Sequence, residues 1–309
     1  MRLDRYALIA CLTALAACAD TPAEPPPPPA RMQIVAGDGQ VRAAGAVLRV
    51  NPTVRVTDAD GRPLKSVPVT FAATRNASAN PVVGYTDKDG VAGTSWTVRS
   101  DGGDDTLLVK VDSLPPATFT ATSLVFTDIS AGFNATCGVT TGGRAFCWGA
   151  NRFGQLGTGD TLDAHLPAPV TGGVRYARYA LGSSTSCGLS LDGQLWCAGT
   201  GGSSNLAYGS SPQPEGGVLR FAKIQSTTFD IFCGLEQSAA VYCWGGSLSG
   251  YPPPVDTIAG ARALFMTVPG GPALDFSVET AGSAFGSLES VCLTPSSDTV
   301  TCYNLFIFG

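Results

Sequence analysis

The stretch from Cys137 to Asp160 reads CGVTTGGRAFCWGANRFGQLGTGD, and its two cysteines lie ten positions apart. This spacing occurs four times in the second half of the chain, in the pairs Cys137/Cys147, Cys187/Cys197, Cys233/Cys243 and Cys292/Cys302. Turn-forming residues separate the partners, as in a tight β-hairpin. Because an odd number of residues lies between them, the partners can face each other across the hairpin at the separation that a disulfide needs. The pattern therefore predicts four hairpins, each closed by a cross-strand disulfide.

Two other states of these cysteines compete with the disulfides. A zinc site requires closely spaced cysteines or histidines. The only histidine of the chain, His165, precedes a Pro-rich segment (Leu166 to Pro169) that we interpret as a connecting loop. We therefore expect neither a metal nor a cofactor. Free thiols in a buried core remain the second alternative, and the compartment of the protein decides between thiols and disulfides.

The N-terminus predicts export. Basic residues precede an apolar run, Tyr6 to Ala17, which is too short to span a bilayer and is typical of a signal peptide. The run ends in Leu15-Ala16-Ala17-Cys18, which resembles the lipobox of bacterial lipoproteins. The resemblance implies a signal peptide over residues 1–17, acyl chains such as palmitate on Cys18 and, because Ala19 follows, the outer membrane. The alternative is an ordinary secretory signal in which Cys18 is incidental.

An oxidising compartment agrees with the distribution of the ten cysteines. Cys11 lies inside the signal and Cys18 at its end, and the other eight all fall in the four pairs. Residues 18–31 contain five consecutive prolines, Pro25 to Pro29, which favour an extended polyproline II rod. We interpret this segment as a tether that holds the rest of the protein away from the membrane.

Composition narrows the classes of fold and function. Charged residues make up only 14 % of the chain and the formal net charge is -5. Nucleic-acid binding depends on clustered Lys and Arg, so we expect no nucleic-acid partner. Long amphipathic helical patterns are absent, and short alternating runs broken by Gly, Pro, Asn and Asp predict an all-β chain. Acid–base and nucleophilic catalysis usually require a histidine or paired carboxylates in a cleft, so we expect no enzyme.

Residues 32–123 predict a β-sandwich. The expected strands are Val54 to Val56, Val67 to Phe71, Gly93 to Val98, Thr106 to Val111 and Thr118 to Ala121. The motifs Val54-x-Val56-Thr57-Asp58-x-Asp60-Gly61 and Thr86-Asp87-x-x-Gly90 resemble the bacterial immunoglobulin-like domains of the invasin and intimin type. The resemblance implies a module that forms a stalk or an adhesive segment on a cell surface, and it specifies no chemistry.

Residues 124–309 contain the C-x9-C units as parts of a longer repeat. The first cysteines of successive units lie 50, 46 and 59 residues apart, in the range of propeller blades. An aromatic residue (Phe126, Tyr176 or Phe221) precedes each of the first three units at a matching distance. Each unit is therefore expected to form one blade.

The first unit carries the most specific motif. Its run Trp148-Gly149-Ala150-Asn151-Arg152-Phe153-Gly154-Gln155-Leu156-Gly157 closely resembles the repeat of the regulator of chromosome condensation family. The resemblance implies a β-propeller in which Trp148, Leu156 and Trp244 pack in the core. A carbohydrate-stacking role for the tryptophans is the alternative.

The fold class that follows is all-β: an immunoglobulin-like β-sandwich and then a partial or small β-propeller of four repeat blades. Propellers of the family usually have seven blades, so the repeats form an open truncated propeller, a compact four-bladed one or a half that pairs with another chain. The apolar run Leu305 to Phe308 needs a cover, which suggests self-association through the edge of the C-terminal blade.

The expected function is binding. We predict a lipid-anchored protein of the bacterial cell envelope, facing the periplasm or the cell surface, that displays a repeat head on an immunoglobulin-like stalk for protein binding or adhesion. Recognition is assigned to two inter-blade segments, Asp160 to Gly173 and Gly199 to Pro214, because loops on a rigid scaffold usually carry it. The alternative is a structural envelope lipoprotein that binds peptidoglycan or polysaccharide.

Overall fold

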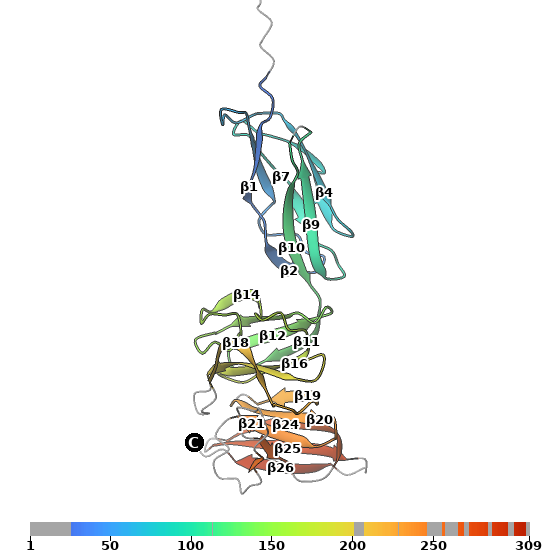
Figure 1. Ribbon diagram of the computed structural model, residues 1–309, viewed down its shortest axis with the longest axis vertical. Helices are drawn as coiled ribbons and strands as arrows, with labels where there is room; N and C mark the ends of the chain where they lie inside the picture. Colours follow the sequence, from blue (N-terminus) through green and yellow to red (C-terminus); the bar gives the residue numbers. More distant parts are fainter. Residues whose placement is uncertain are drawn as a thin grey trace, which may run out of the picture.

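The computed structural model describes residues 26–112, 114–200, 207–227, 229–245, 255–256, 265–268, 272–283, 286–295 and 300–306. Over these residues the regular structure consists of β-strands, arranged as a sandwich followed by four stacked blades along one long axis (Figure 1). In this part of the chain no helix is long and apolar enough to cross a membrane. The predicted signal peptide and Cys18 lie outside the described residues.

The sandwich is built from a three-stranded and a five-stranded sheet, with one additional strand pair. The sheet orders are β1 (Arg31–Ala36), β3 (Thr53–Thr57), β7 (Val91–Gly93); β2 (Gln40–Ala43), β10 (Ala117–Leu124), β9 (Gly103–Lys110), β4 (Pro68–Ala73), β6 (Val83–Tyr85); and β5 (Ser78–Asn80), β8 (Ser95–Thr97). Alternating side chains point inward, and Phe71, Trp96, Leu107 and Phe119 fill the core.

Most strands expected in the sandwich coincide with observed ones. The segment expected as one strand from Gly93 to Val98 is two, because β7 pairs with β3 in one sheet and β8 pairs with β5. Strands β1, β2, β5 and β6 were not predicted from the sequence.

The repeats form four sheets, numbered here as blades 1 to 4 along the chain. Blade 1 contains β11 (Phe126–Ala131), β12 (Ala135–Thr140), β13 (Ala145–Gly149) and β14 (Ala164–Pro169). Blade 2 contains β15 (Tyr176–Leu181), β16 (Thr185–Ser190), β17 (Leu195–Thr200) and β18 (Ala207–Glu215). Blade 3 contains β19 (Phe221–Ser226), β20 (Ile231–Glu236), β21 (Val241–Gly245), β23 (Phe265–Thr267) and β22 (Val255–Asp256). Blade 4 contains β24 (Ala273–Ser283), β25 (Gly286–Pro295) and β26 (Thr301–Phe306).

Each blade contains one disulfide across its C-x9-C hairpin. Cys137 of β12 lies directly opposite Cys147 of β13, with 4.1 Å between their Cα atoms, and the other three pairs repeat this arrangement. Such a short separation is typical of antiparallel pairs that do not exchange backbone hydrogen bonds, where side chains approach most closely. The disulfides are those that the cysteine spacing predicts.

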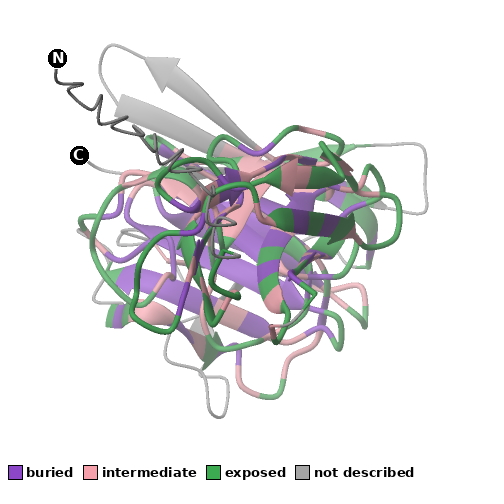
Figure 2. Cartoon of the chain, turned by 90° about the horizontal axis from the view of Figure 1, so that it is seen from above, coloured by how far each residue is buried: buried purple, intermediate pink, exposed green. Residues whose placement is uncertain are grey.

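The blades stack in chain order and do not close into a ring. β15 packs on β11 and β12, β19 on β15 and β16, and β24 on β19 and β20, whereas no comparable packing joins blades 1 and 4 among the described residues. Buried segments gather toward the middle of the molecule and exposed ones at its periphery (Figure 2). The compact four-bladed arrangement is therefore excluded for the described chain, which is an open partial propeller.

Candidate binding surface

The stack of blades has two ends, and we call the one that carries the longer connections the loop end. It consists of residues 132–134, 182–184, 227 and 229–230, which follow the first strand of blades 1 to 3, and of residues 150–163 between β13 and β14. The opposite end carries the short hairpin turns 141–144, 191–194 and 237–240, which are built for compactness.

The first loops of neighbouring blades touch at glycines. A Cβ atom on Gly132 would lie 2.2 Å from the carbonyl oxygen of Gly182, and one on Gly182 would lie 2.2 Å from the Asp230 carboxylate. No real side chain tolerates such contacts, so glycine is needed at both positions. The loops of blades 1, 2 and 3 therefore form one continuous row.

Asp230 clamps blade 3 to blade 2 within this row. Its carboxylate is buried and accepts hydrogen bonds from the backbone N–H groups of Ser184 and Thr185, each at 2.9 Å. The hydroxyls of Ser183 and Ser184 donate to the same carboxylate at 2.7 and 2.6 Å. A buried carboxylate with four donors is satisfied, so Asp230 positions the loops and is not a free acid.

The loop 150–163 is shaped from within by its amide side chains. Asn151 is fully buried; its Oδ1 accepts the N–H of Leu156 at 2.9 Å and its Nδ2 donates to the carbonyl oxygen of Asp160 at 3.0 Å. Gln155 is also buried, and its Oε1 accepts the N–H of Phe153 at 3.0 Å. Leu156 enters the core between blades 1 and 2. These conserved-looking motif positions fold the loop and offer no group to a ligand.

Large apolar side chains are exposed on this clamped scaffold. Phe133 is 71 % exposed, Leu162 is 73 % exposed and Phe229 is 44 % exposed. Phe133 and Phe229 occupy equivalent positions in blades 1 and 3, one residue before Asn134 and Asp230, and Ser183 takes that place in blade 2. Exposed apolar groups held on a rigid frame are a mark of interaction sites. The loop end is therefore the candidate binding surface.

The structure corrects both segments that were assigned to recognition from the sequence. Residues 160–173 include strand β14, and residues 199–214 include most of β18, so each blade completes its sheet with a segment that we predicted to be a loop. Leu162 in the first segment lies on the loop end, whereas residues 201–206 of the second lie outside the described residues. Phe133 and Phe229 were missed, although the recurrence of an aromatic residue four positions before the first cysteine is visible in the sequence.

His165 is not in a loop either. It is an exposed residue of β14, which pairs with β13 on one side only. Prolines are tolerated in such an edge strand because no partner needs their missing N–H group. Pro167 and Pro169 thus misled the sequence interpretation.

The residues predicted as propeller core differ in burial. Leu156 and Trp244 are fully buried, and Trp244 stacks on Phe232 with ring centroids 5.9 Å apart. Trp148 is only half-buried, beside Phe126 at 5.7 Å. Trp244 therefore cannot stack on a sugar ring, whereas part of the Trp148 indole can be reached from solvent.

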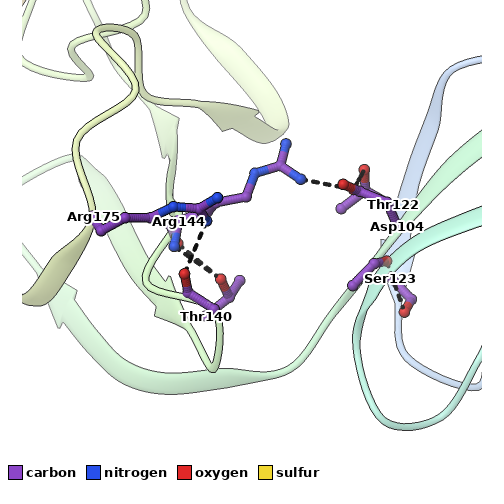
Figure 3. Close-up of polar contacts among 8 residues, drawn as sticks. Asp104, Thr122, Ser123, Thr140, Arg144 and Arg175 are labelled. Atoms are coloured by element: carbon purple, nitrogen blue, oxygen red, sulfur yellow. Dashed lines mark hydrogen bonds and ion pairs between the residues drawn. The ribbon is translucent and has the colours of Figure 1, made fainter.

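A second concave feature lies between the sandwich and blade 1, a cleft of about 630 Å³. Arg144 of the first hairpin turn reaches across it and donates to Asp104 of β9 at 2.7 Å, while Arg175 donates to the carbonyl oxygen of Gly142 at 2.9 Å (Figure 3). Hydroxyl side chains of Thr120 and Thr122 line the sandwich side. Across the described part of the chain, no group of three or more His, Cys, Asp or Glu side chains could hold a metal ion.

Comparison with known proteins identifies the repeats. Residues 126–155 and 142–189 match the Regulator of chromosome condensation (RCC1) repeat. The chain is 30 % identical over 137 residues to the Ultraviolet-B receptor UVR8 of Arabidopsis thaliana, a match that covers 40 % of this chain and 30 % of the receptor. It is 33 % identical over 132 residues to the E3 ubiquitin-protein ligase HERC2 of Homo sapiens, covering 38 % of this chain and 3 % of the ligase. The chain thus spans less than a third of the length of these relatives.

Similar solved structures include both halves of the molecule. Human WBSCR16 aligns with a TM-score of 0.42 at 14 % identity, over 62 % of this chain and 59 % of that one. Yeast RCC1 (Prp20) bound to Kap60 aligns with a TM-score of 0.38 at 16 % identity, over 75 % and 60 %. A C-terminal fragment of intimin, in complex with the intimin-binding domain of its receptor Tir, aligns with a TM-score of 0.27 at 12 % identity, over 90 % and 64 %. RCC1 repeats are present in this chain, and its fold is that of a β domain followed by a partial propeller.

Proposed function

We propose that this protein is a lipid-anchored protein of the bacterial cell envelope that binds a partner protein through the loop end of its blades. The observation that carries the binding role is the row of exposed apolar side chains, Phe133, Phe229 and Leu162, on loops that are clamped to one another. Leaving these groups in water is unfavourable unless a partner covers them, and the fixed loops lower the entropic cost of binding.

Site-specific photocrosslinking in cells tests the binding role. A benzophenone amino acid at position 133 is expected to form an adduct with one partner protein. The same amino acid at Leu191 serves as the matched control, because Leu191 is 68 % exposed but lies in a hairpin turn at the opposite end of the stack. Equal adducts from both positions, or none from position 133, would contradict the proposal.

The anchor is supported by the sequence Leu15-Ala16-Ala17-Cys18 and by the proline-rich segment that follows. Replacement of Cys18 by Ala should abolish incorporation of labelled palmitate and release the protein from the membrane fraction. Replacement of Cys11 by Ser is the control, because Cys11 lies within the predicted signal and should leave labelling unchanged. Retention of the label after Cys18→Ala would refute the lipid anchor.

The alternative function is attachment to peptidoglycan or polysaccharide, and the half-buried Trp148 is the described side chain that favours it. An indole face in reach of solvent is suited to stacking on a sugar ring. Retention of the wild-type protein on purified cell wall, lost on replacement of Trp148 by Ala, would support this role instead of the first.

A further inference from the structure

All three interfaces between blades in the described chain combine the same two kinds of surface. The disulfide and its apolar neighbours project from one side of each blade, which we call its cysteine face. The opposite side, the aromatic face, carries the ring at the start of the first strand. Cys137 and Cys147 of blade 1 share a core with Tyr176 and Tyr179 of blade 2. The cores between blades 2 and 3 and between blades 3 and 4 repeat this combination.

The aromatic face of blade 1 lacks such a partner blade. Ile129 lies opposite Gly138, as Tyr179 lies opposite Gly188 and Ile224 opposite Gly234, so the three residues are equivalent. Tyr179 is 3 % exposed and Ile224 is 4 % exposed, because the preceding blade covers them, but Ile129 is 63 % exposed.

Phe126 and Trp148 on the same face show the same contrast. Phe126 is only half-buried, whereas its equivalents Tyr176 and Phe221 are each 2 % exposed. Trp148 is half-buried, whereas Trp244 of blade 3 is inaccessible. An apolar surface that is covered in two blades is thus left open in the first.

The cysteine face of blade 4 is the complementary open surface. Val300 precedes Cys302 by two positions, as Leu195 precedes Cys197 and Val241 precedes Cys243. Leu195 and Val241 are buried beneath the following blade, but Val300 is 61 % exposed. Cys302 is exposed as well, whereas the cysteines of the first three blades are inaccessible.

We propose that these two faces bind each other between copies of this protein. The cysteine face of blade 4 in one copy docks on the aromatic face of blade 1 in the next, and so continues the interface that the chain already forms three times. The second copy is the favoured occupant because each face is matched by a surface that its equivalents pack against within the chain. Such a contact is heterologous, so it generates a head-to-tail series of molecules.

The sandwich must turn aside for this contact to form. It lies next to blade 1 along the long axis, on the side away from blade 2 (Figure 1). Only Val125 separates β10 from β11, and the ion pair that spans the cleft, Arg144 with Asp104, has side chains 38 % and 72 % exposed. Exposed ion pairs are weak, so this contact can open. Association is therefore expected to compete with the pair between Arg144 and Asp104.

Analytical ultracentrifugation of the purified mature protein tests the proposal with a complementation design. The wild-type protein should show an average mass that rises with concentration. Replacement of Ile129 by Asp, or of Val300 by Asp, places a charge on one of the two faces, and each variant alone should remain monomeric. An equimolar mixture of the two retains one intact pair of faces, so it should form dimers and nothing larger. Both residues are exposed, so circular dichroism should show unchanged folds.

The control and the release of the sandwich complete the test. Leu191→Asp changes an equally exposed apolar residue on neither face and should associate like the wild type. Asp104→Ala should increase association several-fold, because the sandwich is then free to turn. The proposal is overturned if wild-type and Asp104→Ala proteins both remain monomeric at every concentration. It is also overturned if the mixture of the two face variants stays monomeric or grows beyond dimers.

Discussion

At the scale of single residues, the glycine that follows the first cysteine of blades 1 to 3 is explained by the ring that covers it. A Cβ atom on Gly138, Gly188 or Gly234 would lie 2.5 Å from the ring of Phe126, Tyr176 or Phe221, respectively. The Cys-Gly motif and the aromatic residue about a dozen positions upstream are therefore two parts of one packing arrangement, across neighbouring strands of the same blade.

Replacing Gly188 by Ala should destabilise the repeats. The added methyl group would meet the rings of both Tyr176 and Tyr179, at 2.5 and 2.6 Å, and overpacking of this kind costs roughly 1–3 kcal/mol. Urea unfolding measures the loss. Gly142→Ala is the control, since a Cβ atom there would have only the Arg175 guanidinium near it, at 3.8 Å. A Gly188→Ala protein as stable as this control would refute the packing account.

Asp230 should be the most sensitive polar residue of the loop row. Its replacement by Ala removes the acceptor for the N–H groups of Ser184 and Thr185 at a buried site, which we expect to cost about 3 kcal/mol. Hydrogen exchange should then increase first in loops 182–184 and 229–230. The exposed Asp112 provides the control by the same substitution, and a uniform increase in exchange across the sandwich would contradict a local clamp.

Asp105 should make the sandwich less stable as the pH rises. It is 1 % exposed, its Oδ2 accepts the N–H of Arg99, and its Oδ1 has no partner among the described residues. Burial raises the pKa of Asp105 above its ordinary value. The folded state therefore holds the proton more tightly than the unfolded state, and stability declines as pH rises through the interval between the two pKa values.

Replacing Asp105 by Asn removes this dependence. The variant should gain stability relative to the wild type at pH 7, and the gain should shrink toward pH 4, where the wild-type carboxyl is increasingly protonated. Urea unfolding at several pH values measures both effects. Asp112→Asn should show no such trend, and a gain that is equal at pH 4 and pH 7 would argue against a buried charge as its cause.

At the scale of elements, the four disulfide-closed hairpins have one chemistry but different access to solvent. The first three are covered by the following blade, whereas Cys302 of blade 4 is exposed. Thiol–disulfide exchange requires access to a sulfur atom. Mild reduction of the folded protein should therefore open Cys292–Cys302 well before the other three, as measured by alkylation and mass spectrometry.

Unfolding provides the control for this difference. In urea the sulfur atoms of all four disulfides are accessible, so their rates of reduction should converge. Preferential reduction of a disulfide in blades 1 to 3 of the folded protein would contradict the stacking order of the blades.

At the scale of the whole molecule, the sandwich and the blades are connected by Val125 and by the exposed ion pair between Arg144 and Asp104. Salt weakens such a pair. Small-angle X-ray scattering should show a broader distribution of shapes in high salt, and Asp104→Ala should show it at low salt as well. Asp101→Ala is the matched control, because Asp101 pairs with Arg99 inside the sandwich. A profile that ignores both salt and Asp104→Ala would indicate a rigid junction.

The sequence by itself determined the features that depend on short distances along the chain. The ten-residue spacing places Cys137 opposite Cys147 because the period and register of a tight hairpin are local properties, and the same reasoning predicted four blades and an all-β chain. The tertiary structure alone decided which segments close each sheet and which faces remain open. β14 pairs with β13 across a long loop, and the exposure of Ile129 depends on the absence of a blade above it. Burial is a property of non-local packing, so equivalent residues such as Ile129 and Ile224 have opposite fates that no local pattern distinguishes.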